Sequence, residues 1–281
     1  EASAPKPGNV NRYHDFEDTT FEDFLLSAAA VGPAMGRAGN AGVGRTILRA
    51  VRDTRRFVRT NTNLGIILLL APLARAAART GGSLRSRLAE VLAELDVEDA
   101  RAAYAAIRRA QPAGLGRVGE QDVRDEPTVS LRDAMALAAP RDTIAREYVT
   151  DYAVTFETGV PALCRAREQG LDWAAAVTET YLSLLAAVPD TLIARKCGEA
   201  AAREVSREAA RVLDTGEPNS AERREALARF DASLRREGNK LNPGTTADLT
   251  AATLFVHFLE QPTGAARPRH GGPRWPRTKS S

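Results

Sequence analysis

The stretch Leu64–Ala78, "LGIILLLAPLARAAA", decides the fold class of this chain. It opens with the longest apolar run in the sequence, Leu64–Leu73, which contains no charged residue. A run this continuous predicts a central helix that is buried on most sides, because a surface helix would show a polar face. The same run is too short to cross a bilayer, and we expect no signal peptide. We therefore expect a cytoplasmic protein with no membrane partner.

Helical patterns continue on both sides of this stretch. Upstream, Thr19 and Thr20 are each followed three residues later by an acid, Glu22 and Asp23, which is a capping-box pattern that opens a helix. Further helices are predicted at Arg45–Phe57, Leu84–Leu95, Ala100–Arg109, Ile144–Phe156, Pro161–Gln169, Trp173–Ala187, Ile193–Leu213, Ser220–Arg236 and Thr246–Leu259. No alternating stretch typical of a strand appears. We predict an all-α fold, a single domain of about nine or ten helices spanning residues 1–261.

Two segments interrupt the helical pattern with glycine and proline. Gly32–Gly44 carries five glycines, but no strand precedes it and no Gly-Lys-Ser/Thr follows, so a helix–helix connection is favoured over a phosphate loop. Gln111–Val129 is predicted to be a long irregular loop, and loops of this length are usually functional or disordered.

Positive charge is concentrated at the C-terminal end. The 281 residues carry a formal net charge of +3, yet residues 262–281 hold five basic residues and no acid, so residues 1–261 carry −2. The Pro- and Gly-rich composition of residues 262–281 predicts a disordered basic tail. The body offers no basic field for nucleic acid, and we predict none as a partner. The two cysteines and three histidines show no metal-ligand spacing, which argues against a zinc site.

Four short polar segments share one chemistry, and each comes just before a predicted helix. They are "PKPGNVNR" (Pro5–Arg12), "TNTNLG" (Thr60–Gly65), "PDTLIARK" (Pro189–Lys196) and "GNKLNPGTTADL" (Gly238–Leu249). Helix N-termini present unpaired N–H groups and a positive dipole end, so four of them converging would form a polyphosphate site. Asp190 and Asp248 could hold Mg²⁺ there. The alternative, that each segment is a simple N-cap, stays open.

These segments, in this order, resemble the triphosphoribosyl-dephospho-CoA synthase family. The opening "EASAPKPGNVNR" is similar to the family's Glu-Val-Ser-x-x-Pro-Lys-Pro-Gly-Leu-Val-Asp-Arg, and "NPGTTADLTAATLFVHFL" to its Ser-Pro-Gly-Gly-Ser-Ala-Asp-Leu-Leu-Ala ending. Two looser matches lie between them: "NTNLG" falls where the family has Asn-Thr-His-Lys-Gly, and "DTLIARKCG" where it has Asp-Thr-Asn-x-x-x-Arg-Gly-Gly. The resemblance covers about Glu1–Leu259.

The resemblance implies an all-α transferase that uses ATP as a pentosyl donor. In the family, adenine leaves C1 of the ATP ribose, and the triphosphoribosyl group passes to the ribose 2′-hydroxyl of 3′-dephospho-CoA. The product is the precursor of the prosthetic group of citrate or malonate lyase-type acyl carrier proteins. ATP as substrate and Mg²⁺ are the expected cofactors. ATP and dephospho-CoA, or a related cofactor precursor, are the expected small-molecule partners, and a homodimer is left open.

The resemblance also implies roles for individual residues. Asp190, Asp248 and Asn63 are the catalytic candidates, and the two aspartates would bind Mg²⁺ or act as base on the acceptor hydroxyl. The candidates for binding phosphate or nucleotide are Lys6, Asn9, Asn11, Arg12, Asn61, Thr62, Thr191, Lys196, Asn242, Gly244 and Thr245.

Four departures from the family pattern affect the site. Asn11 stands where the family has Asp, Asn63 and Leu64 where it has His and Lys, and Lys196 where it has Arg. Glycosyl transfer needs a base for the acceptor and help for the leaving adenine, so the acceptor side looks altered. The chain therefore resembles a divergent branch, of the kind found in archaea and methylotrophs beside tetrahydromethanopterin genes. Two alternatives follow: phosphoribosyl-type transfer to a different acceptor in tetrahydromethanopterin-type cofactor biosynthesis, or a non-catalytic nucleotide-binding helical protein.

Overall fold

A computed structural model of the chain describes residues 1–112 and 116–261, and for Glu237 only the backbone. The described part is all-α, as predicted, and its one β-type pairing is an isolated bridge between Asn11 and His14. The capping box is present: Thr20 caps the first helix and exchanges hydrogen bonds with Asp23. No helix in the described ranges is both long and apolar enough to span a membrane. The proposed tail, residues 262–281, lies outside the described residues.

The described residues contain more helices than the nine or ten predicted. The α-helices are α1 (Phe21–Met35), α2 (Val43–Thr54), α3 (Leu64–Ala77), α4 (Leu84–Ala93), α5 (Val97–Ala110), α6 (Leu131–Ala138), α7 (Thr143–Val149), α8 (Val160–Glu168), α9 (Trp173–Ala187), α10 (Thr191–Cys197), α11 (Glu199–Leu213), α12 (Ala221–Leu234), α13 (Arg236–Asn239) and α14 (Gly244–Glu260). A 3₁₀ turn, η1 (Ala38–Asn40), and a π-helical turn, η2 (Val154–Gly159), complete the order. Residues 36–42, within the Gly32–Gly44 segment, connect α1 to α2, as expected, while Gly32 and Gly44 themselves lie in the two helices.

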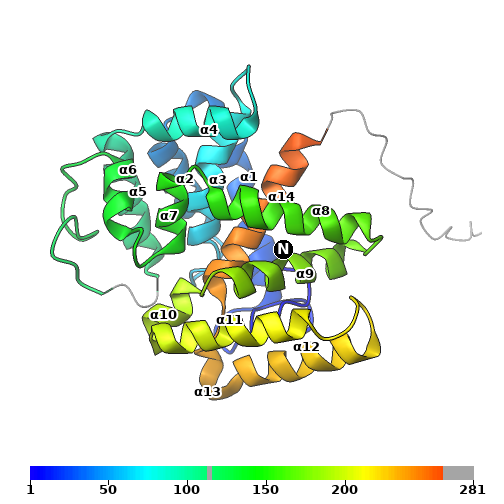
Figure 1. Cartoon of the computed structure of the whole chain (residues 1–281). Helices are drawn as coiled ribbons and strands as arrows, with labels where there is room; N and C mark the ends of the chain where they lie inside the picture. The colour runs from blue at the N-terminus through cyan, green and yellow to red at the C-terminus, as the bar shows by residue number, and fades with distance from the viewer. Residues whose placement is uncertain (113–115, 262–281) are drawn as a thin grey trace, which may run out of the picture.

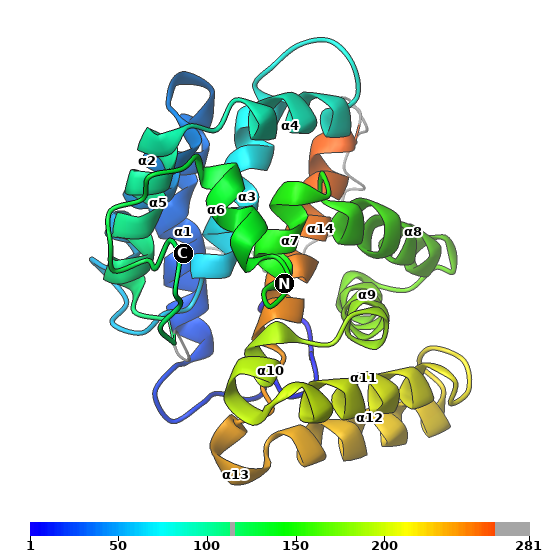
Figure 2. The same ribbon diagram turned by 60° about the vertical axis from the view of Figure 1, so that its left-hand side comes forward.

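Helices α3 and α14 form the centre of the molecule and pack against each other. Figures 1 and 2 show them between α1, α2 and α5 on one side and α9, α11 and α12 on the other. The apolar run of α3 is buried as predicted, and Ile67, Leu69 and Leu73 are fully enclosed in the largest hydrophobic cluster. This burial follows from the continuous apolar sequence, since neighbours cover α3 on several sides.

Helices α9, α11 and α12 pack side by side around a second hydrophobic cluster. Tyr181 and Leu185 of α9 meet Val205 of α11 and Phe230 of α12 in this cluster. The N-terminal arm lies against the same layer: the Tyr181 hydroxyl donates a hydrogen bond to the Pro7 carbonyl oxygen at 2.8 Å. The arm is thus an ordered part of the fold.

Two long helices predicted from the sequence are each divided in the structure. Ile193–Leu213 is split between α10 and α11 at Gly198, whose φ of 88° suits glycine and ends α10. Ile144–Phe156 is split after α7, because Asp151 and Tyr152 both adopt positive φ. The buried carboxylate of Glu147 accepts hydrogen bonds from the backbone N–H groups that open η2, so a side-chain-to-backbone contact across the break stabilises it.

Candidate functional site

A cavity of about 950 Å³ lies where the first turns of α3, α7 and α14 meet the N-terminal arm. Each of the four polar segments identified in the sequence contributes residues to its wall. The contributions are Asn9 and Val10; residues 60–65; Leu192, Arg195 and Lys196; and Gly238, Asn239, Asn242, Gly244, Thr245, Ala247 and Asp248. The four segments therefore converge on one site, in addition to preceding helices.

Helix N-termini contribute backbone donor groups to this cavity. The backbone N–H groups of Gly65 and Ile66 in α3, and of Thr245 in α14, donate to no acceptor among the described residues. Such first-turn N–H groups, together with the positive end of the helix dipole, favour a bound anion. The cavity thus has the donor groups that a phosphate requires.

Asp248 is the carboxylate that the central helices present to the cavity. It begins the second turn of α14, and its Oδ2 is so close to Gly65 of α3 that a Cβ at residue 65 would be 2.0 Å from it. No hydrogen bond from another described residue reaches its carboxylate. Burial, followed by the negative charges of Glu1, Asp190 and Asp142, raises the pKa of Asp248 well above its usual value, and Arg195 opposes this shift.

Asp190 is placed differently from its sequence prediction. Its Oδ1 accepts hydrogen bonds from the backbone N–H groups of Leu192 and Ile193, and its Oδ2 accepts from the N–H and hydroxyl of Thr246. A carboxylate has about four acceptor positions, and here all of them are taken. Asp190 is 1% exposed and is absent from the cavity wall. In this geometry it caps α10 and ties that helix to α14, which leaves no lone pair for a metal or a substrate.

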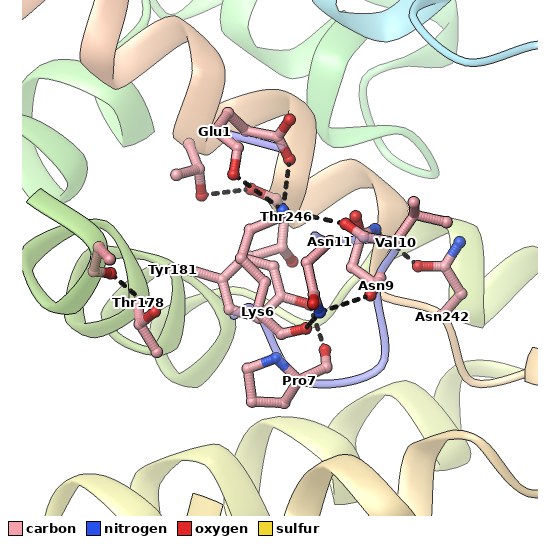
Figure 3. Close-up of polar contacts among 12 residues, drawn as sticks. Glu1, Lys6, Pro7, Asn9, Val10, Asn11, Thr178, Tyr181, Asn242 and Thr246 are labelled. Carbon is pink, nitrogen blue, oxygen red and sulfur yellow. Dashed lines mark hydrogen bonds and ion pairs between the residues drawn. The ribbon is translucent and has the colours of Figure 1, made fainter. Parts of the chain in front are cut away.

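The N-terminal arm also contributes less directly than predicted. The buried Lys6 ammonium pairs with the Glu1 carboxylate at 3.1 Å and donates to the Glu1 and Val10 carbonyl oxygens, as Figure 3 shows. Asn11 is buried, with its amide bonded to carbonyl oxygens of the arm, and Arg12 is exposed; Lys6, Asn11 and Arg12 are absent from the cavity wall. Asn9 lies in the wall and donates from Nδ2 to Oδ1 of Asn242.

The remaining predicted residues lie in or next to the cavity wall. Asn61 accepts a hydrogen bond from the first N–H of α3, and the Thr62 hydroxyl bonds that of Ser27. Thr191 and Thr245 bond each other through their hydroxyls, at 3.2 Å, although only Thr245 reaches the wall. Asn242, Gly244 and Lys196 also line the cavity.

Asn63 and Leu64, the two departures in the second segment, both line the cavity. The Asn63 amide donates to the hydroxyl of Thr54, and Leu64 belongs to the hydrophobic core. The wall is therefore neutral and partly apolar where the family pattern has His and Lys.

Sequence reasoning missed three features of the wall. Gly65 provides the space for Asp248, and Glu1 lines the cavity while pairing with Lys6. Asp142, the N-cap of α7, forms an ion pair with Arg195 of α10 at 2.6 Å. Only the family's glycine after Asn-Thr-His-Lys gave a signal for Gly65. No sequence signal links residues 142 and 195, because they lie on different helices.

A magnesium site formed by the protein alone does not fit these residues. In residues 1–112 and 116–261 no group of three or more His, Cys, Asp or Glu side chains could hold a metal ion. Of the predicted pair, Asp190 is saturated with hydrogen bonds and Asp248 stands without a second ligand. We therefore assign no metal ligand among the described residues, and Mg²⁺ binding by Asp190 and Asp248 stays a prediction.

Known proteins are similar to this chain in sequence and in fold. A model of the family described as ATP:dephospho-CoA triphosphoribosyl transferase matches residues 1–267. The chain belongs to this family. A protein of Pseudomonas savastanoi pv. phaseolicola, described as a probable 2-(5''-triphosphoribosyl)-3'-dephosphocoenzyme-A synthase, is 31% identical, over 93% of this chain and 87% of that protein. One of Klebsiella pneumoniae is 26% identical, over 81% of this chain and 70% of that protein.

A solved structure extends the likeness to three dimensions. The crystal structure of a protein from Archaeoglobus fulgidus, described as a triphosphoribosyl-dephospho-CoA synthase, superposes with a TM-score of 0.66 at 28% identity. The match covers 84% of this chain and 99% of that one. The likeness to this family thus extends from the sequence to the fold.

Proposed function

We propose that this chain transfers the triphosphoribosyl group of ATP to a hydroxyl of dephospho-CoA and releases adenine. Membership of the family across residues 1–267 supports the reaction. The structural observation that carries it is a large cavity that combines helix N-termini, which favour anions, with the buried carboxyl of Asp248 next to the first turn of α3. A triphosphate needs the first feature, and transfer to a hydroxyl needs a group that can exchange a proton.

The two ends of the reaction use different parts of the wall. The N–H groups of Gly65, Ile66 and Thr245 are backbone donors available to phosphate oxygens, and Lys196 adds a positive charge nearby. Asp248 is the proton-exchanging group of the transfer step. Lys6 acts through the arm, by holding the Glu1 carboxylate in the cavity wall.

Mg²⁺ would reach this site with the nucleotide. Magnesium commonly binds through substrate phosphates and one or two carboxylates while keeping several waters. A triphosphate with bound Mg²⁺ therefore needs no dedicated cluster of protein carboxylates. No step of the proposed reaction depends on the ion touching a residue of this chain.

A second acceptor is favoured by one observation. Asn63 and Leu64 make the wall beside Asp248 neutral and partly apolar where the family pattern has an imidazole and an ammonium. An acceptor with fewer anionic groups than dephospho-CoA, such as a pterin-type cofactor precursor, fits such a wall.

The test is to measure free adenine after incubation with ATP, Mg²⁺ and dephospho-CoA. We expect release that depends on dephospho-CoA, and a loss of about 10²–10⁴-fold in Asp248→Asn, because proton transfer contributes about that much. Asp214→Asn, at the exposed C-cap of α11, is the matched control. ATP binding without release until a pterin-type acceptor is added would favour the second acceptor. No release with either acceptor, despite ATP binding, would leave a nucleotide-binding protein.

A further inference from the structure

The N-termini of α7, α10 and α14 are joined by side chains on one side of the cavity. The Thr191 hydroxyl of α10 accepts a hydrogen bond from the Thr143 backbone N–H of α7 at 3.3 Å and donates to the Thr245 hydroxyl of α14 at 3.2 Å. The Asp142–Arg195 ion pair connects α7 and α10 a second time. The three helix ends are therefore held in a fixed relation to one another.

The Asp142 carboxylate, which binds Arg195, is itself fixed by hydrogen bonds to α7. Its Oδ1 caps α7 by accepting from the N–H groups of Ile144 and Ala145, while its Oδ2 accepts from an Arg195 Nη1–H at 2.6 Å. A carboxylate anchored on two backbone N–H groups has little freedom, and a charge-assisted bond this short is among the stronger hydrogen bonds in proteins. The Arg195 side chain is thus ordered by Asp142.

Most of the Arg195 guanidinium remains available to a ligand. A guanidinium carries five N–H donors, and the bond to Asp142 uses one; the others have no acceptor among the described residues. Both side chains are 28–29% exposed, and both residues line the cavity. Arg195 also lies close enough to Asp248 to influence its pKa. Its donors therefore face the space beside the proposed reaction centre.

We propose that Asp142 positions Arg195 to bind the phosphates of the donor nucleotide, so that the two residues act as one unit. This inference rests on the proposed function for the identity of the nucleotide. Arg195 provides planar, forked donors that match phosphate oxygens, and Asp142 removes the side-chain freedom that binding would otherwise have to restrict. Asp142 is a positioning residue, because it acts through Arg195.

An opposing effect has to be weighed. The negative charge of Asp142 repels phosphate, so removing it could strengthen binding. That charge is already neutralised by Arg195 and by two backbone N–H groups, whereas Arg195 would lose its only hydrogen-bonded anchor among the described residues. We therefore expect the loss of positioning to outweigh the relief of repulsion.

The test is a double-mutant cycle on KM for ATP, with Mg²⁺ and dephospho-CoA present. Arg195→Ala should raise KM by about 10–100-fold with a smaller change in kcat. Asp142→Asn, which keeps an N-cap residue on α7, should raise it by about 3–10-fold without lowering the melting temperature. The double variant should match Arg195→Ala alone. Asp172→Asn at the exposed N-cap of α9, which has no arginine partner among the described residues, should leave KM unchanged.

Several results would overturn the inference. A lower KM in Asp142→Asn would mean that repulsion dominates, and additive effects in the cycle would mean that Asp142 acts through α7 alone. Calorimetric titration with ATP and Mg²⁺ separates this proposal from the reaction itself. If ATP binds with the predicted cycle but adenine is never released, the proposed function fails and the positioning role stands. If adenine is released and Arg195→Ala leaves KM for ATP unchanged, only the positioning role fails.

Discussion

At the scale of single residues, Gly65 and Asp248 share one small volume. Gly65 is the second residue of α3, and the Asp248 carboxylate fills the space that a side chain at residue 65 would occupy. The sequence shows Gly65 only as one letter of a loosely matched motif. The need for glycine at residue 65 is seen only in the folded structure, where α3 packs against α14, because Gly65 and Asp248 are far apart in the chain.

This close contact predicts that Gly65→Ala disrupts the site. The added Cβ would be 2.0 Å from Asp248 Oδ2, so the carboxyl must move or the helices must separate. We expect adenine release to fall at least about 100-fold and stability to fall by about 1–3 kcal/mol. Thermal unfolding and the adenine assay measure the two effects.

Two further variants make this prediction specific. Gly32→Ala in α1 is the matched control, because a Cβ there meets nothing within 4 Å and alanine favours a helix by up to about 1 kcal/mol. Combining Gly65→Ala with Asp248→Ala should recover most of the melting temperature but not activity, since the flexible end of Ile144, whose Cδ1 would be 2.7 Å from the added Cβ, still has to shift. If the double variant stays as unstable as Gly65→Ala, the collision is not with Asp248.

At the scale of secondary-structure elements, Asp190 links the first turns of two helices. Its four hydrogen bonds join the N-terminus of α10 to Thr246 of α14. In Asp190→Asn one oxygen becomes an NH₂ group, which cannot accept from the two donors it faces. We expect a loss of about 1–3 kcal/mol in unfolding free energy, measured by chemical denaturation.

The same variant distinguishes a structural role from a metal-binding one. A structural role predicts the same loss in Mg²⁺ and in chelator, whereas a metal ligand would show a loss that depends on Mg²⁺. Asp172→Asn should change stability by only a few tenths of a kcal/mol, since Asn caps a helix about as well as Asp. If Asp190→Asn lowers the unfolding free energy only when Mg²⁺ is present, Asp190 is a metal ligand.

The elements that could be predicted from sequence are those fixed by local patterns. The apolar run of α3 and the capping box of α1 gave the correct helices, because periodicity and capping are local properties. The breaks after α7 and at Gly198 were missed. The first depends on the buried Glu147 carboxylate accepting hydrogen bonds from N–H groups of η2, and helical periodicity does not show which carboxylate will make such bonds.

At the scale of the whole molecule, the convergence of the four segments was predictable but the orientation of their side chains was not. Shared chemistry and the family resemblance brought the segments to one site, and all four line one cavity. Lys6 and Asp190 were expected to face a ligand, but in the structure they bind the protein itself. Residue type indicates what a side chain can bind, while the packing of the folded chain decides which partner it does bind.

The location of the cavity predicts how much of the chain the reaction needs. Every described residue that lines it precedes residue 249, and the described packing ends with α14 at Glu260. We therefore expect a chain ending at Gln261 to keep its melting temperature and its rate of adenine release within about twofold. A chain lacking residues 1–12 should lose both, because the arm supplies Asn9 to the cavity and bonds Tyr181 in the second hydrophobic cluster. The family match extends to residue 267, so a chain ending there is the intermediate case. If activity returns only in that longer chain, residues 262–267 contribute to the site and the domain boundary lies beyond 261.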